Sequence, residues 1–412
     1  MAKNVITCSF CGRDKRSAKM LIAGQSGHIC EVCVAEAYKI VSAESESSHK
    51  ETAKQSLTLL KPGAIKKYLD EYIIGQDQAK KVLSVAVYNH FKRISNTLPS
   101  HEEIEIEKSN IILAGETGTG KTLMARTIAK LLNVPFCIAD ATVLTEAGYV
   151  GEDVESVLSR LLQAANYDVP ATERGIVFID EIDKIARKGD NASITRDVSG
   201  EGVQQGLLKL LEGSIVNVPP QGGRKHPEQK MVQINTKNIL FVCGGAFDGI
   251  EKIIARRMNT SAIGFSASAS AQEVERNNLL QYVIPQDLKT FGLIPELIGR
   301  LPITTYMNSL DATTLRRILT EPKNALVKQY QSLFRIDNIE LHFDNDVLDL
   351  VVEKAMENKL GARGLRGICE AIMLDVMYEI PSDKNPPKEF TVTIDYARKK
   401  LSNEAFGNLK AA

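Results

Sequence analysis

Short, continuous apolar runs recur through the middle of the chain. Residues 111–114, 135–139, 176–179 and 238–243 each run almost without a polar interruption. Runs of this length without alternation are typical of strands that are buried on both faces, as in a parallel sheet covered by helices. A proline-bounded run at residues 303–307 predicts one more strand.

Apolar residues at helical spacing occupy the segments around these runs. The spacing predicts helices over residues 59–93, with an apolar turn at 72–76, and over residues 122–132, 152–162 and 203–212. From residue 309 the pattern is mainly helical, with short strands at 339–343 and 390–394 and a long helix beginning near residue 360. The chain therefore predicts an α/β domain built on a parallel sheet flanked by helices, followed by a smaller α-rich domain.

The first apolar run opens directly into a phosphate-binding loop. The loop consists of Gly115, Glu116, Thr117, Gly118, Thr119, Gly120, Lys121 and Thr122, and a predicted helix follows it. Glycines let the backbone N–H groups converge on phosphate oxygens, and the helix start adds a favourable dipole. Lys121 is expected to neutralise the β- and γ-phosphate oxygens, and the Thr122 hydroxyl to complete the coordination of Mg²⁺. The loop predicts binding of ATP with Mg²⁺.

Adjacent carboxylates follow the run at residues 176–179. Asp180 and Glu181 then stand at the carboxyl end of a buried strand, where open α/β sheets bind their ligands. We assign Asp180 to the Mg²⁺ ion and Glu181 to the water that attacks the γ-phosphate. An acidic strand end is often only a helix cap, but the upstream loop favours the catalytic interpretation.

Four of the seven cysteines lie within the first 33 residues. Cys8 and Cys11 form one Cys-x-x-Cys pair, and Cys30 and Cys33 form a second, at a spacing that suits a four-thiolate zinc site. Four protein ligands leave no open position, so we predict one structural Zn²⁺ per chain. The other cysteines, Cys137, Cys243 and Cys369, lie in apolar surroundings and are predicted to be core residues.

Composition limits the class of protein and its compartment. The 51 basic and 51 acidic side chains cancel, which argues against a dedicated nucleic-acid or membrane-surface protein. No apolar stretch reaches the length of a membrane span, and the first residues lack a signal-peptide core. The cysteine count speaks against a disulfide framework. We therefore expect a cytoplasmic protein.

A small, polar and charged segment at residues 42–58 is typical of a flexible linker. The chain has 412 residues, more than one ordinary domain with a single hydrophobic core contains, and the linker divides it into predicted parts. These parts are a zinc-binding module at 1–41, the linker at 42–58, a large ATPase domain at 59–308 and a small C-terminal domain at 309–412.

Several further motifs exceed what a simple nucleotide-binding domain needs. They are Tyr149 and Val150 between two glycines, the basic triplet Arg224, Lys225 and His226 in a Pro/Gly-rich loop, and Ile263, Gly264 and Phe265 inside a low-complexity segment. An aromatic ring between glycines suits a gripping loop, a basic triplet attracts acidic groups, and two apolar side chains in a loop suit docking. The ordinary alternatives are a ring tucked into the core, a solvated loop and a loop pinned to its own domain.

Three other features predict contacts to the nucleotide. Ile73 and Ile74 lie in the turn ahead of the nucleotide fold, where they either pack on an adenine ring or belong to the core. Arg300 follows a short predicted helix, and phosphoryl transfer benefits from an arginine delivered in cis or from a neighbouring subunit. Arg363, at the start of the long C-terminal helix, is placed to reach a nucleotide between the two domains.

Together these motifs resemble the AAA+ family, and their order along essentially the whole chain is similar to that of the family's protein unfoldases that feed a peptidase. The resemblance implies a homohexamer with Arg300 as an arginine finger and Arg363 as a second sensor. It implies that Tyr149 and Val150 pull a threaded polypeptide, and that the basic triplet attracts a substrate's terminal carboxylate. It further implies that residues 263–265 dock on the peptidase ring, and that the zinc module dimerises and binds adaptor proteins or substrates.

The sequence departs from the family at one point and leaves two other function classes open. The strand ending at Gly245 offers no Asn or Thr as a polar first sensor. A ring ATPase acting on nucleic acid through a zinc ribbon is one alternative, against which the balanced charge counts. A module that only holds ATP is the other, against which Glu181 and Arg300 count.

Overall fold

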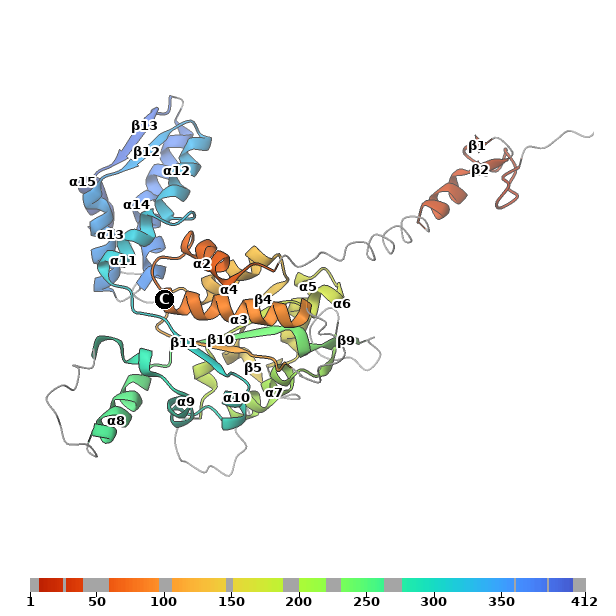
Figure 1. Ribbon diagram of the computed structural model, residues 1–412. Helices are drawn as coiled ribbons and strands as arrows, with labels where there is room; N and C mark the ends of the chain where they lie inside the picture. Colours follow the sequence, from red (N-terminus) through yellow and green to blue (C-terminus); the bar gives the residue numbers. More distant parts are fainter. Residues whose placement is uncertain are drawn as a thin grey trace, which may run out of the picture. The chain divides into compact units, whose positions relative to one another are not determined.

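The computed structural model describes residues 7–24, 27–39, 59–95, 106–145, 151–187, 200–219, 231–262, 276–358, 361–383 and 385–402. The chain divides into two compact units, Met1–Thr58 and Leu59–Ala412. Figure 1 shows the first unit in red and the second in orange to blue.

The first unit is built around a small antiparallel ribbon. Strands β1 (Leu21–Ala23) and β2 (His28–Cys30) pair, and residues 31–39 are helical. The described part of this unit buries little apolar surface: Phe10 and Tyr38 are about three-quarters exposed, at 74% and 73%. A segment this small needs more than a hydrophobic core to hold its fold.

The second unit contains a five-stranded, all-parallel sheet. Its strands, in spatial order, are β11 (Ile303–Tyr306), β3 (Ile111–Ala114), β10 (Leu240–Gly245), β7 (Ile176–Asp180) and β4 (Phe136–Asp140). The predicted strands are confirmed within two residues at each end. The parallel register aligns Ala114 with Gly245 and Tyr306, so the carboxyl ends of the strands meet along one edge.

Helices cover both faces of this sheet, which explains the apolar runs. Ile112, Val177 and Phe241 face a core shared with α5 and α7, whereas α3 and α4 contact the other face. The helices of this part are α2 (Pro62–Asp70), α3 (Asp77–Ser95), α4 (Lys121–Leu132), α5 (Ser156–Ala164), α6 (Val169–Thr172), α7 (Glu201–Glu212), α8 (Ile250–Ala262), α9 (Pro285–Phe291) and α10 (Pro295–Gly299). In the described residues before 309, four 3-10 segments and two short strand pairs complete this part, among them β8 (Ile215–Val218) with β9 (Val232–Asn235).

One predicted helix boundary is wrong. The helix predicted over residues 152–162 begins only at Ser156, because Glu152 and Asp153 form strand β6, which pairs with β5 (Leu144–Thr145). The Glu152 carboxylate then accepts a hydrogen bond from Ser156 Oγ at 3.2 Å. Glu152 therefore precedes the helix and supports its first turn.

The C-terminal part of this unit has its own hydrophobic core. Helices α11 (Ala312–Thr320), α12 (Leu326–Ile336), α13 (Asn345–Glu357), α14 (Gly361–Glu379) and α15 (Ile394–Ser402) surround it, together with the parallel pair β12 (Glu340–Phe343) and β13 (Glu389–Val392). We call residues 310–402 the C-terminal subdomain and residues 59–308 the sheet subdomain. The α-rich character predicted for this part is confirmed. No helix in the described ranges of the chain is both long and apolar enough to cross a membrane.

The three isolated cysteines are core residues, as predicted. Cys137, Cys243 and Cys369 are at most 7% exposed. Burial raises the pKa of each thiol to about 12. These thiols therefore stay protonated and unreactive.

A buried asparagine ties the sheet to its neighbours at the amino end of β3. Asn110 is 1% exposed; its Nδ2 donates to the Leu211 carbonyl at 3.2 Å and to the Arg300 carbonyl at 2.9 Å. Its Oδ1 accepts from the Phe241 N–H at 3.4 Å. One side chain thus joins α7, β10 and the segment after α10.

Replacing this asparagine is expected to destabilise the second unit. Asn110→Ala leaves two carbonyls and one N–H, in buried or partly buried positions, without this partner, which costs about 2–4 kcal/mol. The urea midpoint of unfolding, followed by circular dichroism, should fall clearly. Asn89→Ala, on the exposed side of α3, is the matched control and should leave the midpoint nearly unchanged. Equal midpoints for the two variants would contradict the structural role of Asn110.

Candidate nucleotide pocket and zinc centre

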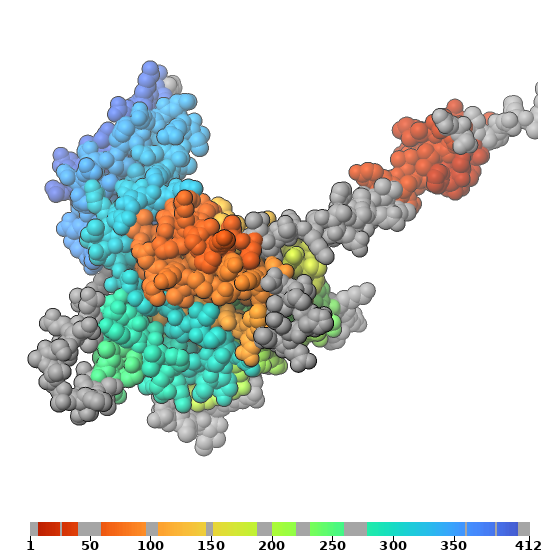
Figure 2. Space-filling model, viewed as in Figure 1, coloured from red at the N-terminus to blue at the C-terminus, as the bar shows by residue number. Residues whose placement is uncertain are grey.

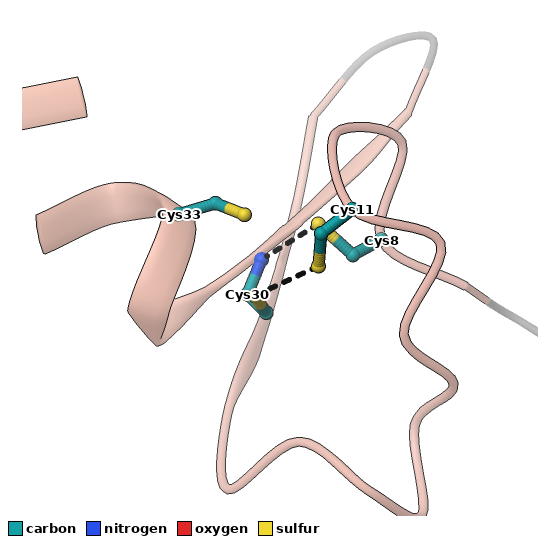
Figure 3. Close-up of side chains that lie close together, drawn as sticks. All are labelled: Cys8, Cys11, Cys30 and Cys33. Carbon is teal, nitrogen blue, oxygen red and sulfur yellow. Dashed lines mark hydrogen bonds between the residues drawn. The ribbon is translucent and has the colours of Figure 1, made fainter. Parts of the chain in front are cut away.

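The four N-terminal cysteines converge in the first unit, as predicted. Cys8 and Cys11 come from the loop before β1, Cys30 ends β2 and Cys33 lies in the helix that follows (Figure 3). Their four sulfurs lie within 4.8 Å of one another, and those of Cys11 and Cys30 are 3.6 Å apart. Zn–S bonds of about 2.3 Å in a tetrahedron place sulfurs about 3.8 Å apart, so the spacing fits Zn²⁺.

Backbone N–H groups favour the thiolate form of Cys8, which is the form that binds a metal cation. N–H groups, that of Cys11 foremost, lower the pKa of the Cys8 thiol to about 6. The N–H of Cys30 also donates to Cys8 Sγ at 3.3 Å. The pKa of the Cys33 thiol is raised to about 12, mainly by a hydrogen bond with Cys11 and to a smaller extent by burial. Four thiolates at this spacing repel one another, and a doubly charged metal ion is what holds them together.

The phosphate loop lies at the carboxyl edge of the sheet, directly after β3. Gly115 has φ +155° and packs so closely on Met307 that a Cβ atom there would lie 2.7 Å from the Met307 Cβ. Gly118 and Gly120 have φ +86° and +101°, which glycine adopts without strain. The loop therefore needs glycine at these positions for conformation, and at Gly115 also for space.

Lys121 is buried beneath the loop and held by it. The residue is 7% exposed, and Nζ donates to the carbonyls of Gly115 at 2.5 Å and Glu116 at 2.9 Å. Burial lowers the pKa of Lys121, and the carboxylates of Asp180 and Asp183 oppose that shift. A cation held in this way suits a polyanionic ligand.

The two oxygen groups assigned to Mg²⁺ lie side by side. Thr122 Oγ1 donates to Asp180 Oδ2 at 3.1 Å, although the residues are 58 positions apart. A hydroxyl and a carboxylate at this edge are the oxygen ligands that Mg²⁺ takes in addition to phosphate and water.

Glu181 stands beside this pair in an unusual conformation. Its φ and ψ are +57° and +34°, and its N–H donates to Asp180 Oδ1 at 3.0 Å. A left-handed conformation costs a glutamate about 1–2 kcal/mol. The Glu181 side chain is exposed, and backbone outliers of this kind gather at functional sites.

A pocket of about 330 Å³ joins these groups to both subdomains. It is lined by loop residues 117–122, by Asp180, Glu181, Ile73 and Ile74, and from the C-terminal subdomain by Ala362 and Arg363. The volume is within the range of small-ligand pockets. The structure thus brings together the residues predicted to bind the phosphates and Mg²⁺, the predicted catalytic base Glu181, and the predicted second sensor Arg363.

For Ile73 and Ile74 the structure shows the core position, one of the two interpretations that the sequence left open, and the contact with an adenine ring stays a prediction. They are only 6% and 7% exposed, so they are core residues, yet they also line the pocket. Tyr72, Leu310, Ile318 and Pro322, which the sequence pattern did not indicate, form further apolar lining. An apolar end opposite a phosphate loop suits a purine base.

Other predicted site residues are placed differently. Arg300 does not line this pocket; its Nη2 contacts Glu212 at 3.0 Å, and its carbonyl is held by Asn110 at the opposite end of β3. Tyr149, Val150, Arg224, Lys225, His226, Ile263, Gly264 and Phe265 lie outside the described residues.

The strand end without an Asn or Thr receives a carboxylate from elsewhere. Asp183 is 5% exposed, lines the pocket, and accepts from the Ala246 N–H at 3.1 Å just after β10. Lys184 lies 3.6 Å from both Asp183 and Asp248. A polar group therefore occupies this place from the 3-10 turn (Ile182–Ile185) that follows the neighbouring strand β7, which no pattern within β10 indicates.

Comparison with known proteins identifies the family. Residues 6–43 match the model of the ClpX C4-type zinc finger, residues 106–304 the AAA domain (Cdc48 subfamily), and residues 310–394 the C-terminal, D2-small domain of ClpB protein. The chain is 62% identical over 408 residues to the ATP-dependent Clp protease ATP-binding subunit ClpX of Bacteroides thetaiotaomicron, covering 98% of each chain. The chain belongs to the ClpX family. The proteins of that name from Bacteroides fragilis and Porphyromonas gingivalis are 61% and 60% identical, with 98% and 96% of each chain covered.

Family membership confirms the predicted ATPase activity and the predicted cofactors. The protein is an AAA+ ATPase that uses ATP with Mg²⁺, and its N-terminal unit binds Zn²⁺ through a Cys₄ cluster. The fold class is confirmed as well. A ring ATPase acting on nucleic acid finds no support in these comparisons.

Zinc removal is expected to unfold the first unit alone. Cys8→Ser should abolish the bound zinc, about one ion per chain in the wild type, and amides in residues 7–39 should exchange rapidly. Cys137→Ser, a cysteine outside the cluster, is the matched control and should keep its zinc. Zinc content by atomic absorption and hydrogen exchange by mass spectrometry provide the measurements. Full zinc content in Cys8→Ser would rule out the four-thiolate site.

Proposed function

We propose that the protein is the ATP-driven motor of a Clp protease, which unfolds tagged proteins and passes them into a separate peptidase, ClpP. The observation that carries the proposal is the pocket lined by both the phosphate loop and Arg363 of the C-terminal subdomain. A nucleotide held between two such parts changes their relative position when it is hydrolysed. The kinship with ClpX, a named subunit of an ATP-dependent protease, supports this use of the movement.

We propose a role for each pocket residue on the basis of its contacts. Lys121 leaves its two carbonyl partners for the β- and γ-phosphates, and Thr122 and Asp180 hold Mg²⁺. Glu181 orients and deprotonates the attacking water. Ile73 and Ile74 pack on the base.

Arg300 acts on a neighbouring subunit in this proposal. It is exposed at the amino end of the sheet, about 10–13 Å of extended strand away from its own phosphate loop. A residue so placed serves a site in trans when subunits contact head to tail and the ring closes. A homohexamer is the proposed ring, with Arg363 reporting the nucleotide state within each subunit.

The loops outside the described residues complete the proposal. Tyr149 and Val150 grip the threaded chain, and Arg224, Lys225 and His226 attract the terminal carboxylate of a tagged substrate. Ile263, Gly264 and Phe265 dock on ClpP. The zinc module at 1–41 dimerises and binds adaptors, and the linker at 42–58 joins it to domains at 59–308 and 309–412.

The unfolding of a reporter tests this function. A stable fluorescent protein with a C-terminal degradation tag is mixed with the wild type, ATP, Mg²⁺ and a trap that prevents refolding. Fluorescence should fall without any peptidase. Glu181→Gln should bind ATP but hydrolyse it about 100-fold more slowly or worse, since it lacks the base, and should leave the reporter folded.

The exposed variant Glu357→Gln, at the end of α13, is the matched control and should behave as the wild type. ATP hydrolysis by the wild type with an intact reporter would overturn the unfolding function. Undiminished hydrolysis by Glu181→Gln would overturn the role of that carboxylate.

A further inference from the structure

A buried glutamine links the turn of residues 71–76 to the segment that leads into the C-terminal subdomain. Gln76 is 5% exposed and forms a two-way pair with the backbone of Asn308, 232 positions away. Its Nε2 donates to the Asn308 carbonyl at 2.8 Å, and its Oε1 accepts from the Asn308 N–H at 2.7 Å. The side chain therefore pairs with Asn308 as a neighbouring strand would.

The backbone at Gln76 is held in a costly conformation. Its φ is +59°, directly after Gly75 at +64°, and a left-handed conformation costs a non-glycine residue about 1–2 kcal/mol. Its carbonyl accepts from the Lys80 N–H at 3.0 Å, in the first turn of α3. Such strain persists where surrounding contacts fix it, and the pair with Asn308 is such a contact.

Asn308 is the junction between the two subdomains. The preceding Met307 donates its N–H to the Ala114 carbonyl at 2.8 Å and packs on Gly115 of the phosphate loop. Three residues later Asp311 caps the N-terminus of α11 through the Thr314 N–H at 2.7 Å. A shift of Asn308 therefore reaches both the phosphate loop and the first helix of the C-terminal subdomain.

The other end of the same turn holds the far end of α11. Lys323, three residues beyond this helix, donates its N–H to the Glu71 carbonyl at 2.8 Å, and its Nζ contacts the Glu71 carboxylate at 2.7 Å. In the space-filling view the two segments are in direct contact, orange against cyan (Figure 2). Helix α11 is thus attached at both ends to the turn of residues 71–76.

The turn between these anchors carries the apolar side chains of the pocket. Ile73 and Ile74 line it, and the Ile73 carbonyl accepts from Lys80 Nζ, a fully buried amine, at 2.6 Å. Leu310 and Ile318, from the attached subdomain, line the same pocket. A base in the pocket therefore contacts the turn and the helix that the turn holds.

We propose that Gln76 is a positioning residue that couples occupancy of the nucleotide pocket to the orientation of α11. The turn of residues 71–76 is a clamp: a bound base fixes it, and the Gln76–Asn308 pair transmits that restraint to the C-terminal subdomain. The inference rests on the proposed nucleotide site. Gln76 does not line the pocket, so its action on the nucleotide is indirect.

The test removes the pair without adding backbone strain. Gln76→Gly keeps the left-handed conformation, which glycine adopts freely, and deletes both hydrogen bonds. Gln76→Leu keeps the apolar stem and deletes the polar atoms. Asn338→Gly, an exposed residue at φ +60° in the C-terminal subdomain, is the matched control for the change of backbone.

Hydrogen exchange of the full chain, with and without ADP and Mg²⁺, provides the measurement. In the wild type and in Asn338→Gly, ADP should slow exchange in the phosphate loop and in residues 311–320. In both Gln76 variants the loop should still be protected, while the protection of residues 311–320 should fall about fivefold or more.

Each other outcome has a distinct meaning. Equal protection of residues 311–320 in the wild type and in both Gln76 variants would overturn the coupling role. The coupling role would also be overturned if ADP protected the phosphate loop in the wild type and in Asn338→Gly but not in the Gln76 variants. Gln76 would then support the pocket itself. An unprotected loop in the wild type would instead overturn the proposed nucleotide site. If Gln76→Leu unfolds, as circular dichroism would reveal, Gln76→Gly decides.

Discussion

The close approach of Gly115 to Met307 is the contact on which the nucleotide site depends. It places the first residue of the phosphate loop on the end of β11, where any side chain would collide with the Met307 Cβ. The parallel register brings Asp180 to the same edge, and Asn308 follows Met307 into the C-terminal subdomain. This one contact, which leaves no room for a side chain at residue 115, thus connects the phosphate loop, the edge that carries the metal ligands and the junction.

The two units of the chain are stabilised by different means. The second unit has two hydrophobic cores, one on the sheet and one among the C-terminal helices. The described residues of the first unit contain the four sulfurs and bury little apolar surface, so the metal is expected to supply most of the folding free energy there. A change of zinc content is therefore expected to act first on the fold of the N-terminal unit.

Local patterns were sufficient for the sheet and for the chemistry that lies on one segment. Short motifs predicted this chemistry from their spacing alone: the phosphate loop, the adjacent Asp180 and Glu181, and the paired cysteines. The helix predicted over residues 152–162 starts too early, because Glu152 and Asp153 pair as a strand with Leu144 and Thr145, a pairing that helical periodicity does not reveal. The β8–β9 pair was missed, although Ile215–Val218 alternates between exposed and buried positions.

What the sequence did not reveal depends on contacts between distant segments. Tyr72, Ile318 and Pro322 join the pocket from both subdomains, and Asp183 occupies the position that β10 leaves without a polar residue. Gln76 looks like an ordinary residue before a helix until its pair with Asn308 is seen. Such contacts have no signature in a single segment, because each partner is unremarkable alone.

Binding of a fluorescent ADP analogue to Gly115→Ala tests the central claim most directly. The added methyl group overlaps Met307 and forces a backbone that alanine avoids, so affinity should fall about tenfold or more while the sheet stays folded. Gly299→Ala, whose added Cβ would meet nothing within 4 Å, should bind as the wild type. Wild-type affinity in Gly115→Ala would contradict the account.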